Sequence, residues 1–215
     1  MEYFNIFTHI VLVLSLGWYL ITNLQWYSYK IERVIFKHHK LNWHIIYFAK
    51  PFVLYYLLPS MYFSIYFYAL YLPLLVMWNM KLDKPLVLTS RVQRFLALLL
   101  FITFSINLLC FASEVCVSVG LFIPLLLAYI VSFALERIFF ISFKSKAKKK
   151  LKSMNNLTII AITASYGKTS IKNYLHQILK LKYNAYKTPR SVNTLAGLVL
   201  DVNRDMPENS EIYIA

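Results

Sequence analysis

Four long stretches without a charged side chain most constrain how this chain can fold. They cover residues 6–26, 52–78, 95–113 and 115–135 and are rich in leucine, isoleucine, phenylalanine and tyrosine. A helix needs roughly 20 consecutive apolar residues to cross the hydrocarbon core of a bilayer. A chain that is 59% hydrophobic and 15% charged is neither a disordered chain nor a wholly soluble domain. We therefore predict an N-terminal α-helical membrane domain of four to five spans over residues 1–143.

The basic side chains of the loops predict which ends of these helices face the cytoplasm. Residues 27–50 carry five lysines and arginines against one glutamate, and residues 79–94 carry four against one aspartate. Lys and Arg are enriched in the cytoplasmic loops of membrane proteins. Both loops and the basic C-terminal part therefore belong on the same side, so the chain must cross an even number of times between the two loops. We predict an N-terminus outside and a C-terminus in the cytoplasm.

Prolines allow the segment between the two basic loops to fold back on itself. Pro59 breaks a helix and Ser60 can cap the next one, so residues 42–78 can form a hairpin. This gives five spans, or three spans and a re-entrant hairpin, while residues 95–135 form another hairpin that turns at residues 113–114. The alternative is four spans with one basic loop on the wrong side.

A run of lysines separates the membrane domain from the rest of the chain. Residues 144–152 contain six lysines and no acid. Beside a bilayer, such a cluster gains about 1 kcal/mol per charge from anionic lipid. A lysine run also suits nucleic acid, but no nucleic-acid-binding motif accompanies this one, and we expect no such partner. We assign residues 144–153 to a basic juxtamembrane linker that contacts anionic headgroups.

Beyond the linker, the sequence pattern changes to that of an α/β domain. The expected elements are strands at residues 157–163, 183–187 and 211–215 and amphipathic helices at residues 171–179 and 195–202. The first strand is a β-branched run typical of a buried parallel strand. The first helix carries Ile171, Tyr174, Leu175, Ile178 and Leu179 at the spacing of one apolar face. The alternation predicts that residues 154–215 begin an α/β P-loop domain with a parallel sheet.

The segment between the first of these strands and the first helix has the composition of a phosphate-binding loop. It reads Ala164-Ser165-Tyr166-Gly167-Lys168-Thr169-Ser170. Backbone N–H groups around Gly167 and at the helix N-terminus can surround an anion. Lys168 can reach the β- and γ-phosphates of ATP, and the Thr169 hydroxyl can bind Mg²⁺. We therefore predict a site for ATP and Mg²⁺ formed by Ser165, Tyr166, Gly167, Lys168, Thr169 and Ser170.

The spacing within this loop resembles that of the Mur ligase family. The common phosphate-binding loop has a further glycine where this chain has Ile162. The Mur ligase loop, G-[ST]-x-G-K-T-[ST], is matched from residue 164 to residue 170, with Ala164 in place of the first glycine. After the loop, the pair Ile171-Lys172, the stretch Thr188-Pro189-Arg190-Ser191-Val192-Asn193-Thr194 with Gly197 after it, and the strand at residues 211–215 follow in family order. The similarity covers about residues 155–215.

The resemblance implies an ATP-dependent amide-forming ligase of peptidoglycan precursor synthesis. The chain most resembles the family members that add D-alanyl-D-alanine to a UDP-linked muramyl tripeptide. The resemblance therefore implies two partners, this UDP-linked peptide and a dipeptide. Lys168 is then the catalytic residue that stabilises charge on the phosphates, and Thr169 is the metal ligand. Asn193 and Thr194 carry over as residues near the triphosphate. The implied location is the bacterial inner membrane, with multiple spans.

Several family features have no counterpart in this chain. Membrane spans take the place of the N-terminal domain that holds the uridine nucleotide. The family's metal-binding glutamate, carbamylated lysine and C-terminal domain would follow residue 215. We therefore expect an N-terminal fragment that is incomplete for catalysis. The alternative is a non-catalytic membrane scaffold or regulator of cell-wall synthesis that binds a nucleotide.

Overall fold

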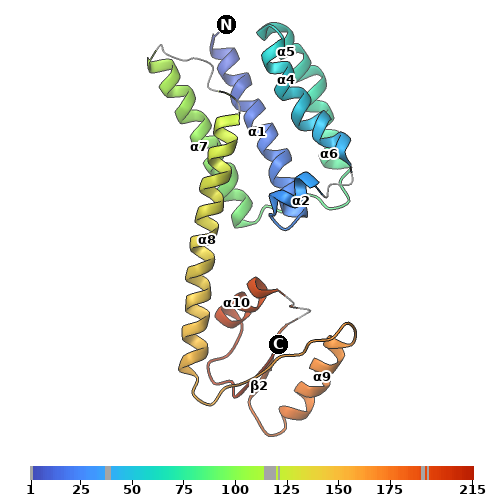
Figure 1. Ribbon diagram of the computed structural model, residues 1–215, viewed down its shortest axis with the longest axis vertical. Helices are drawn as coiled ribbons and strands as arrows, with labels where there is room; N and C mark the ends of the chain where they lie inside the picture. The colour runs from blue at the N-terminus through green and yellow to red at the C-terminus, as the bar shows by residue number, and fades with distance from the viewer. Residues whose placement is uncertain (1, 37–39, 114–119, 121, 190–191, 193) are drawn as a thin grey trace. The chain divides into compact units, whose positions relative to one another are not determined.

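The computed structural model describes residues 2–36, 40–113, 120, 122–189, 192 and 194–215 (Figure 1). The chain forms two compact units, the helical unit Met1–Ala134 and the α/β unit Leu135–Ala215. The elements of the helical unit are α1 (Glu2–Trp26), α2 (Ile31–Phe36), α3 (Leu41–His44), η1 (Ile45–Ala49), α4 (Lys50–Leu57), α5 (Ser60–Tyr66), η2 (Phe67–Tyr71), α6 (Leu72–Met80) and α7 (Ser90–Ser113). Helix α8 (Phe122–Ser153) begins in the helical unit and ends in the α/β unit, which continues with β1 (Thr158–Ile160), α9 (Lys168–Leu179), β2 (Ala185–Lys187), α10 (Leu195–Arg204) and β3 (Ile212–Ile214). The predicted boundaries between membrane domain, basic linker and α/β domain, after residues 143 and 153, stay predictions.

Four helical segments of the described chain are long and apolar enough to cross a membrane. They are Tyr3–Trp26, Ser60–Met80, Ser90–Cys110 and Phe122–Ser153. Within the helical unit, many of their large side chains are exposed, including Phe101 of α7. Exposed apolar surface of this kind is compatible with membrane association.

Residues 41–57 and 60–80 form a helical hairpin that turns at Leu58 and Pro59. The Tyr55 and Phe63 rings meet at 5.1 Å close to the turn, and the Tyr47 and Trp78 rings meet at 5.3 Å far from it, so the two arms are antiparallel. Leu58 is extended because the proline after it disfavours a helical conformation. The cap expected from Ser60 is not formed: Pro59 takes the N-cap position, and Ser60 is the first helical residue.

Both arms of this hairpin contain a π-helical turn followed closely by a proline. Pro51 follows η1 and Pro73 follows η2. In a regular helix the N–H of residue 51 would bond to the carbonyl of Tyr47, but proline has no N–H. The Tyr71 hydroxyl of the opposite arm donates to that carbonyl at 3.0 Å. The local sequence thus frees a backbone group, and the partner arm satisfies it.

The described parts of the two basic loops lie at the same end of the helical unit. The Trp26 indole N–H at the end of α1 donates to the Lys84 carbonyl at 2.8 Å. The Gln25 side chain bonds to both the N–H and the carbonyl of Val87, at 2.9 and 2.8 Å. The Arg91 guanidinium lies 3.7 Å from the centre of the Tyr29 ring. Figure 1 shows α1 between α7 and the hairpin, with these loops at its C-terminal end.

The α/β unit contains a parallel sheet in the order β1-β3-β2. Its central strand is fully buried, and the Tyr213 ring stacks on the Tyr186 ring of β2 at 6.0 Å. This face packs against α10 and the last turns of α8, in a cluster formed by Ala147, Val199, Val202, Met206 and Tyr213. The lysine-rich segment 144–153 is therefore helical and packed along one side, and Lys150 donates to the Met206 carbonyl.

A buried carboxylate of α10 holds two strands of this sheet. Asp201 is 2% exposed, and its two oxygens accept the Tyr186 and Tyr213 hydroxyls, each at 2.7 Å. Burial, and after it the Asp201 carboxylate, raises the pKa of both phenols. At any pH below about 10, the ordinary pKa of tyrosine, both hydroxyls therefore stay protonated and bonded to Asp201. Their contribution to stability is lost as the pH rises through the higher pKa of the folded state.

We expect Asp201→Ala to destabilise the α/β unit by about 2–4 kcal/mol, because two buried hydroxyls lose a charged acceptor. Hydrogen exchange of the β2 and β3 amides measures this local stability. Asp205→Ala is the matched control, since Asp205 pairs with Arg204 only at the surface, at 3.7 Å, and such pairs contribute little. Equal exchange rates in the two variants would contradict the role given to Asp201.

Candidate functional site

The predicted phosphate-binding loop joins the end of β1 to the start of α9. Backbone pairing continues past β1, since the Ile162 N–H donates to the Ala215 carbonyl at 2.8 Å. Gly167 is the N-cap of α9, with φ 77° and ψ −1°, and no side chain caps the helix there. The left-handed conformation favours glycine. The N–H groups of the first turn have no partner within the helix and can bind an anion.

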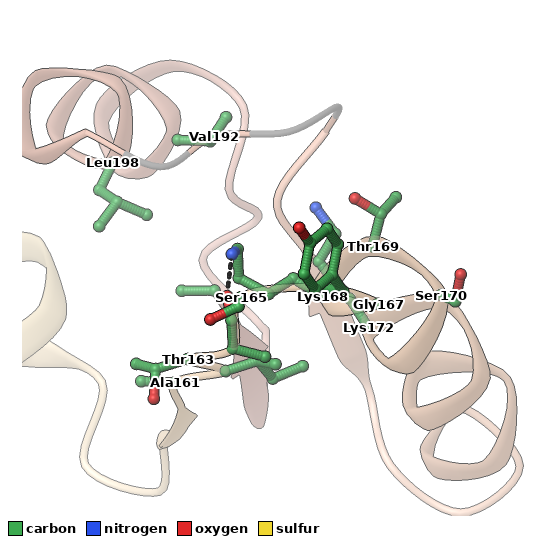
Figure 2. Close-up of a pocket in the computed structure, with 14 residues that line it drawn as sticks. Ala161, Thr163, Ser165, Gly167, Lys168, Thr169, Ser170, Lys172, Val192 and Leu198 are labelled. Carbon is green, nitrogen blue, oxygen red and sulfur yellow. Dashed lines mark hydrogen bonds between the residues drawn. The ribbon is translucent and has the colours of Figure 1, made fainter.

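The loop borders a pocket of about 780 Å³ at the carboxyl ends of β1 and β3 (Figure 2). All six predicted loop residues from Ser165 to Ser170 line it, together with Ala161, Ile162, Thr163, Ala164, Lys172, Val192, Leu198 and Ala215. Figure 2 shows Lys168 and Thr169 at the start of α9, with Val192 and Leu198 on the α10 side. In open α/β sheets, ligands bind outside the carboxyl ends of the strands.

Among the described residues that line this pocket, the two with charged side chains are lysines. The Lys168 ammonium donates to the Ala164 carbonyl, across the loop. Lys172 lies one turn further along α9, and no Asp or Glu is found among the lining residues that the structure describes. The pocket therefore has the electrostatic character required by an anion.

Lys172 is a lining residue that was not among the predicted site residues. It is 6% exposed, and its ammonium donates to the carbonyl and hydroxyl oxygens of Thr188 at 2.8 and 2.9 Å. Burial, followed by the charge of Lys187, lowers the pKa of Lys172, while Asp201 opposes the shift. Lys172 thus fixes the end of β2 beside the loop. Its spacing of four residues from Lys168, on the same helix face, is the signal that could have identified it.

Of the two other predicted site residues, the structure describes Thr194. Thr194 is the N-cap of α10, and its hydroxyl accepts the Gly197 N–H at 3.2 Å. It is not among the residues that line the pocket. Asn193 lies outside the described residues. Roles near a triphosphate remain predictions for both.

Protein ligands for a metal ion are few in the described part of the chain. No group of three or more His, Cys, Asp or Glu residues there could hold a metal ion. Thr169 lines the pocket and offers a hydroxyl. A metal ion at this site would therefore take most of its ligands from the oxygens of a bound phosphate and from water.

The backbone of Gly167 provides a test of the loop. In the part of the chain that the structure describes, no neighbouring atom lies within 4 Å of a Cβ placed at this residue, so the cost of a side chain there comes from its φ of +77°. We expect Gly167→Ala to strain the loop by about 1–2 kcal/mol and to weaken nucleotide binding by roughly tenfold. Titration with Mg-ATP measures this. Gly167→Asn is the control, because asparagine tolerates the left-handed region, and equal losses in both variants would contradict the backbone explanation.

Comparison with known proteins gives a short local similarity. No protein-family model matches the chain, and no solved structure matches it. A stretch of 56 residues is 41% identical to UDP-N-acetylmuramoyl-tripeptide–D-alanyl-D-alanine ligase of Bacillus subtilis. The matched stretch covers 26% of this chain and 12% of the ligase. The chain is therefore similar, over about a quarter of its length, to a Mur-type ligase.

Proposed function

We propose that this chain is a membrane-anchored part of an ATP-dependent amide-forming ligase of peptidoglycan precursor synthesis. The proposed reaction adds D-alanyl-D-alanine to UDP-N-acetylmuramoyl-tripeptide. The observation that carries the proposal is the pocket at the ends of β1 and β3, in which Ser165 to Ser170 and Lys172 come together. The local similarity to the Bacillus subtilis ligase supports the reaction class.

The size and charge of the pocket support ATP as its ligand. Its volume of about 780 Å³ lies within the roughly 300–1,000 Å³ of small-molecule sites. Its lysines complement a triphosphate, and the uncapped first turn of α9 offers N–H donors. Because the described lining residues include no carboxylate, the Thr169 hydroxyl is the side chain that we assign to Mg²⁺.

The loop residues would bind and orient the phosphates. The N–H groups of residues 166–170 would hold the phosphate oxygens, and Lys168 would exchange the Ala164 carbonyl for the β- and γ-oxygens. Bound Mg²⁺ supplies positive charge against the charge that develops on these oxygens. In the proposed reaction, the tripeptide carboxylate takes the γ-phosphoryl group as ADP leaves, and the dipeptide amine then displaces phosphate to form the amide. Positioning provides most of the catalysis in such transfers.

The helical unit supports a location in the bacterial inner membrane. Four helices have the required length and apolar character, and the basic loops lie at one end of the unit. Positive charge at that end favours the cytoplasmic side. We propose an N-terminus outside and a cytoplasmic α/β unit, with the lysines of residues 144–153 that do not face α10 directed at anionic headgroups.

Two measurements on the purified full chain test the function. Titration with Mg-ATP should show saturable binding, and absence of binding would refute the nucleotide site. Phosphate release is then followed with UDP-N-acetylmuramoyl-tripeptide and D-alanyl-D-alanine present together or singly. Release that requires both substrates supports the ligase. Binding without release is the result expected both of a chain that is incomplete for catalysis and of the non-catalytic scaffold.

A further inference from the structure

A second cavity, of about 500 Å³, lies within the helical unit between α1, α2, residues 41–48 and the start of α8. Tyr19, Val34 and Leu125 are buried and form its floor. Ile35, Leu41 and Leu126 are exposed and form its edge. The cavity is therefore open along one side to whatever surrounds the apolar helices.

The polar atoms at the floor of this cavity bond to one another. The His44 Nε2 lies 2.9 Å from the Val34 carbonyl, which can only accept, so Nε2 carries the proton. The other ring nitrogen of His44 then accepts the Tyr19 hydroxyl at 2.7 Å. The Asn23 amide donates to the Tyr19 carbonyl at 2.8 Å. A bound molecule is thus offered an apolar surface, which suits a hydrocarbon chain.

The rim of the cavity carries an excess of positive charge. Lys30 and Lys40 directly precede the lining residues Ile31 and Leu41, and both lysines are exposed. Arg33 is also exposed on α2, and Glu32 is the one acid in the described part of residues 27–50. The rim belongs to the end of the helical unit that holds the basic loops. An apolar cavity beneath a basic rim is complementary to an anionic amphiphile.

We infer that the helical unit binds one anionic phospholipid of the cytoplasmic leaflet, with an acyl chain in this cavity and its phosphate at Lys30, Arg33 and Lys40. The inference rests on the membrane insertion and orientation proposed above. It assigns a ligand to the membrane part of the chain and is independent of the nucleotide pocket.

Native mass spectrometry of the full chain, extracted from membranes and titrated with phosphatidylglycerol or phosphatidylcholine, tests the inference. We expect one tightly retained phosphatidylglycerol per chain and weaker binding of phosphatidylcholine. Leu126→Trp should fill the cavity and lower phosphatidylglycerol occupancy at least tenfold. Leu127→Trp is the matched control, because Leu127 is the next residue of α8, is similarly exposed at 41% against 43%, and does not line the cavity.

A second pair of variants tests the headgroup independently of the cavity. Lys30→Gln with Arg33→Gln should reduce the preference for phosphatidylglycerol roughly fivefold per charge. Lys81→Gln with Lys84→Gln removes the same charge from the other basic loop and should leave the preference unchanged. The inference would be overturned if Leu126→Trp and Leu127→Trp lost phosphatidylglycerol equally, or if the wild type retained the two lipids equally. Either result would mean that lipid binds only in the annular shell around the helices. A chain that washes off membranes in alkaline carbonate would instead refute the proposed insertion.

Discussion

Replacing Lys168 by alanine should lower the affinity for Mg-ATP by roughly ten- to a hundredfold. The Lys168 ammonium lies at the start of α9, beside the N–H groups of the uncapped first turn. A hydrogen bond between charged groups contributes about 1.5–3 kcal/mol, and each 1.4 kcal/mol is a factor of ten. Among the described residues of the pocket wall, Lys172 is the other cation, and it is already bonded to two oxygens of Thr188.

Calorimetric titration of the wild type and of Lys168→Ala with Mg-ATP measures this loss. Lys180→Ala is the matched control, since Lys180 is exposed at the other end of α9 and its removal changes the net charge equally. The control should bind like the wild type. Undiminished binding by Lys168→Ala would refute the phosphate-loop assignment. A similar loss of affinity in both variants would mean that Lys168 acts only through the net positive charge of the chain.

The elements that local chemistry determines could be predicted from the sequence. The chain turns at Leu58 and Pro59, as predicted, because the proline disfavours a helical conformation in the residue before it. The loop at residues 164–170 lies between a strand and a helix because the β-branched run and the helical spacing are both short-range patterns. Three strands in parallel follow from the same alternation.

The faces of α9 show what local pattern could not determine. Ile171, Tyr174 and Ile178 belong to the predicted apolar face, yet all three are exposed. The side of α9 that meets the sheet instead includes Lys172 and His176, whose ring nitrogen lies 3.1 Å from the Ala185 carbonyl. Hydrophobic periodicity assigns the inward side from apolar character alone, and it does not anticipate lysine bonded to backbone oxygens.

The end of helix α8 was also beyond the reach of composition. The charge pattern changes sharply at residue 144, but α8 continues to Ser153 without a break. Lysine is a good helix former, so a lysine run need not end a helix. Ala147 and Leu151 pack on the α/β unit's cluster, a tertiary contact that the sequence pattern did not reveal.

We expect a cysteine placed at Lys84 to resist a membrane-impermeant thiol reagent applied from outside, and to react once the membrane is opened. The structure makes this a sharp test, because the Lys84 carbonyl accepts the Trp26 indole N–H. Arg91 lies on Tyr29 in the same region. The two basic loops therefore lie at one end of the helical unit, and the proposed topology returns the hairpin of residues 41–80 to the cytoplasmic side.

The labelling is performed with Cys110 and Cys116 replaced by alanine, so that each new cysteine is the single reactive group. Tyr3→Cys should be labelled from outside, and Arg33→Cys should behave like Lys84→Cys. Ser60→Cys, at the tip of the hairpin, separates the remaining alternatives: labelling from outside indicates five spans, and protection indicates a re-entrant hairpin. Outside labelling at Lys84 together with protection at Arg33 would require four spans, and it would contradict the loop contacts that hold the two basic segments together at one end of the helical unit.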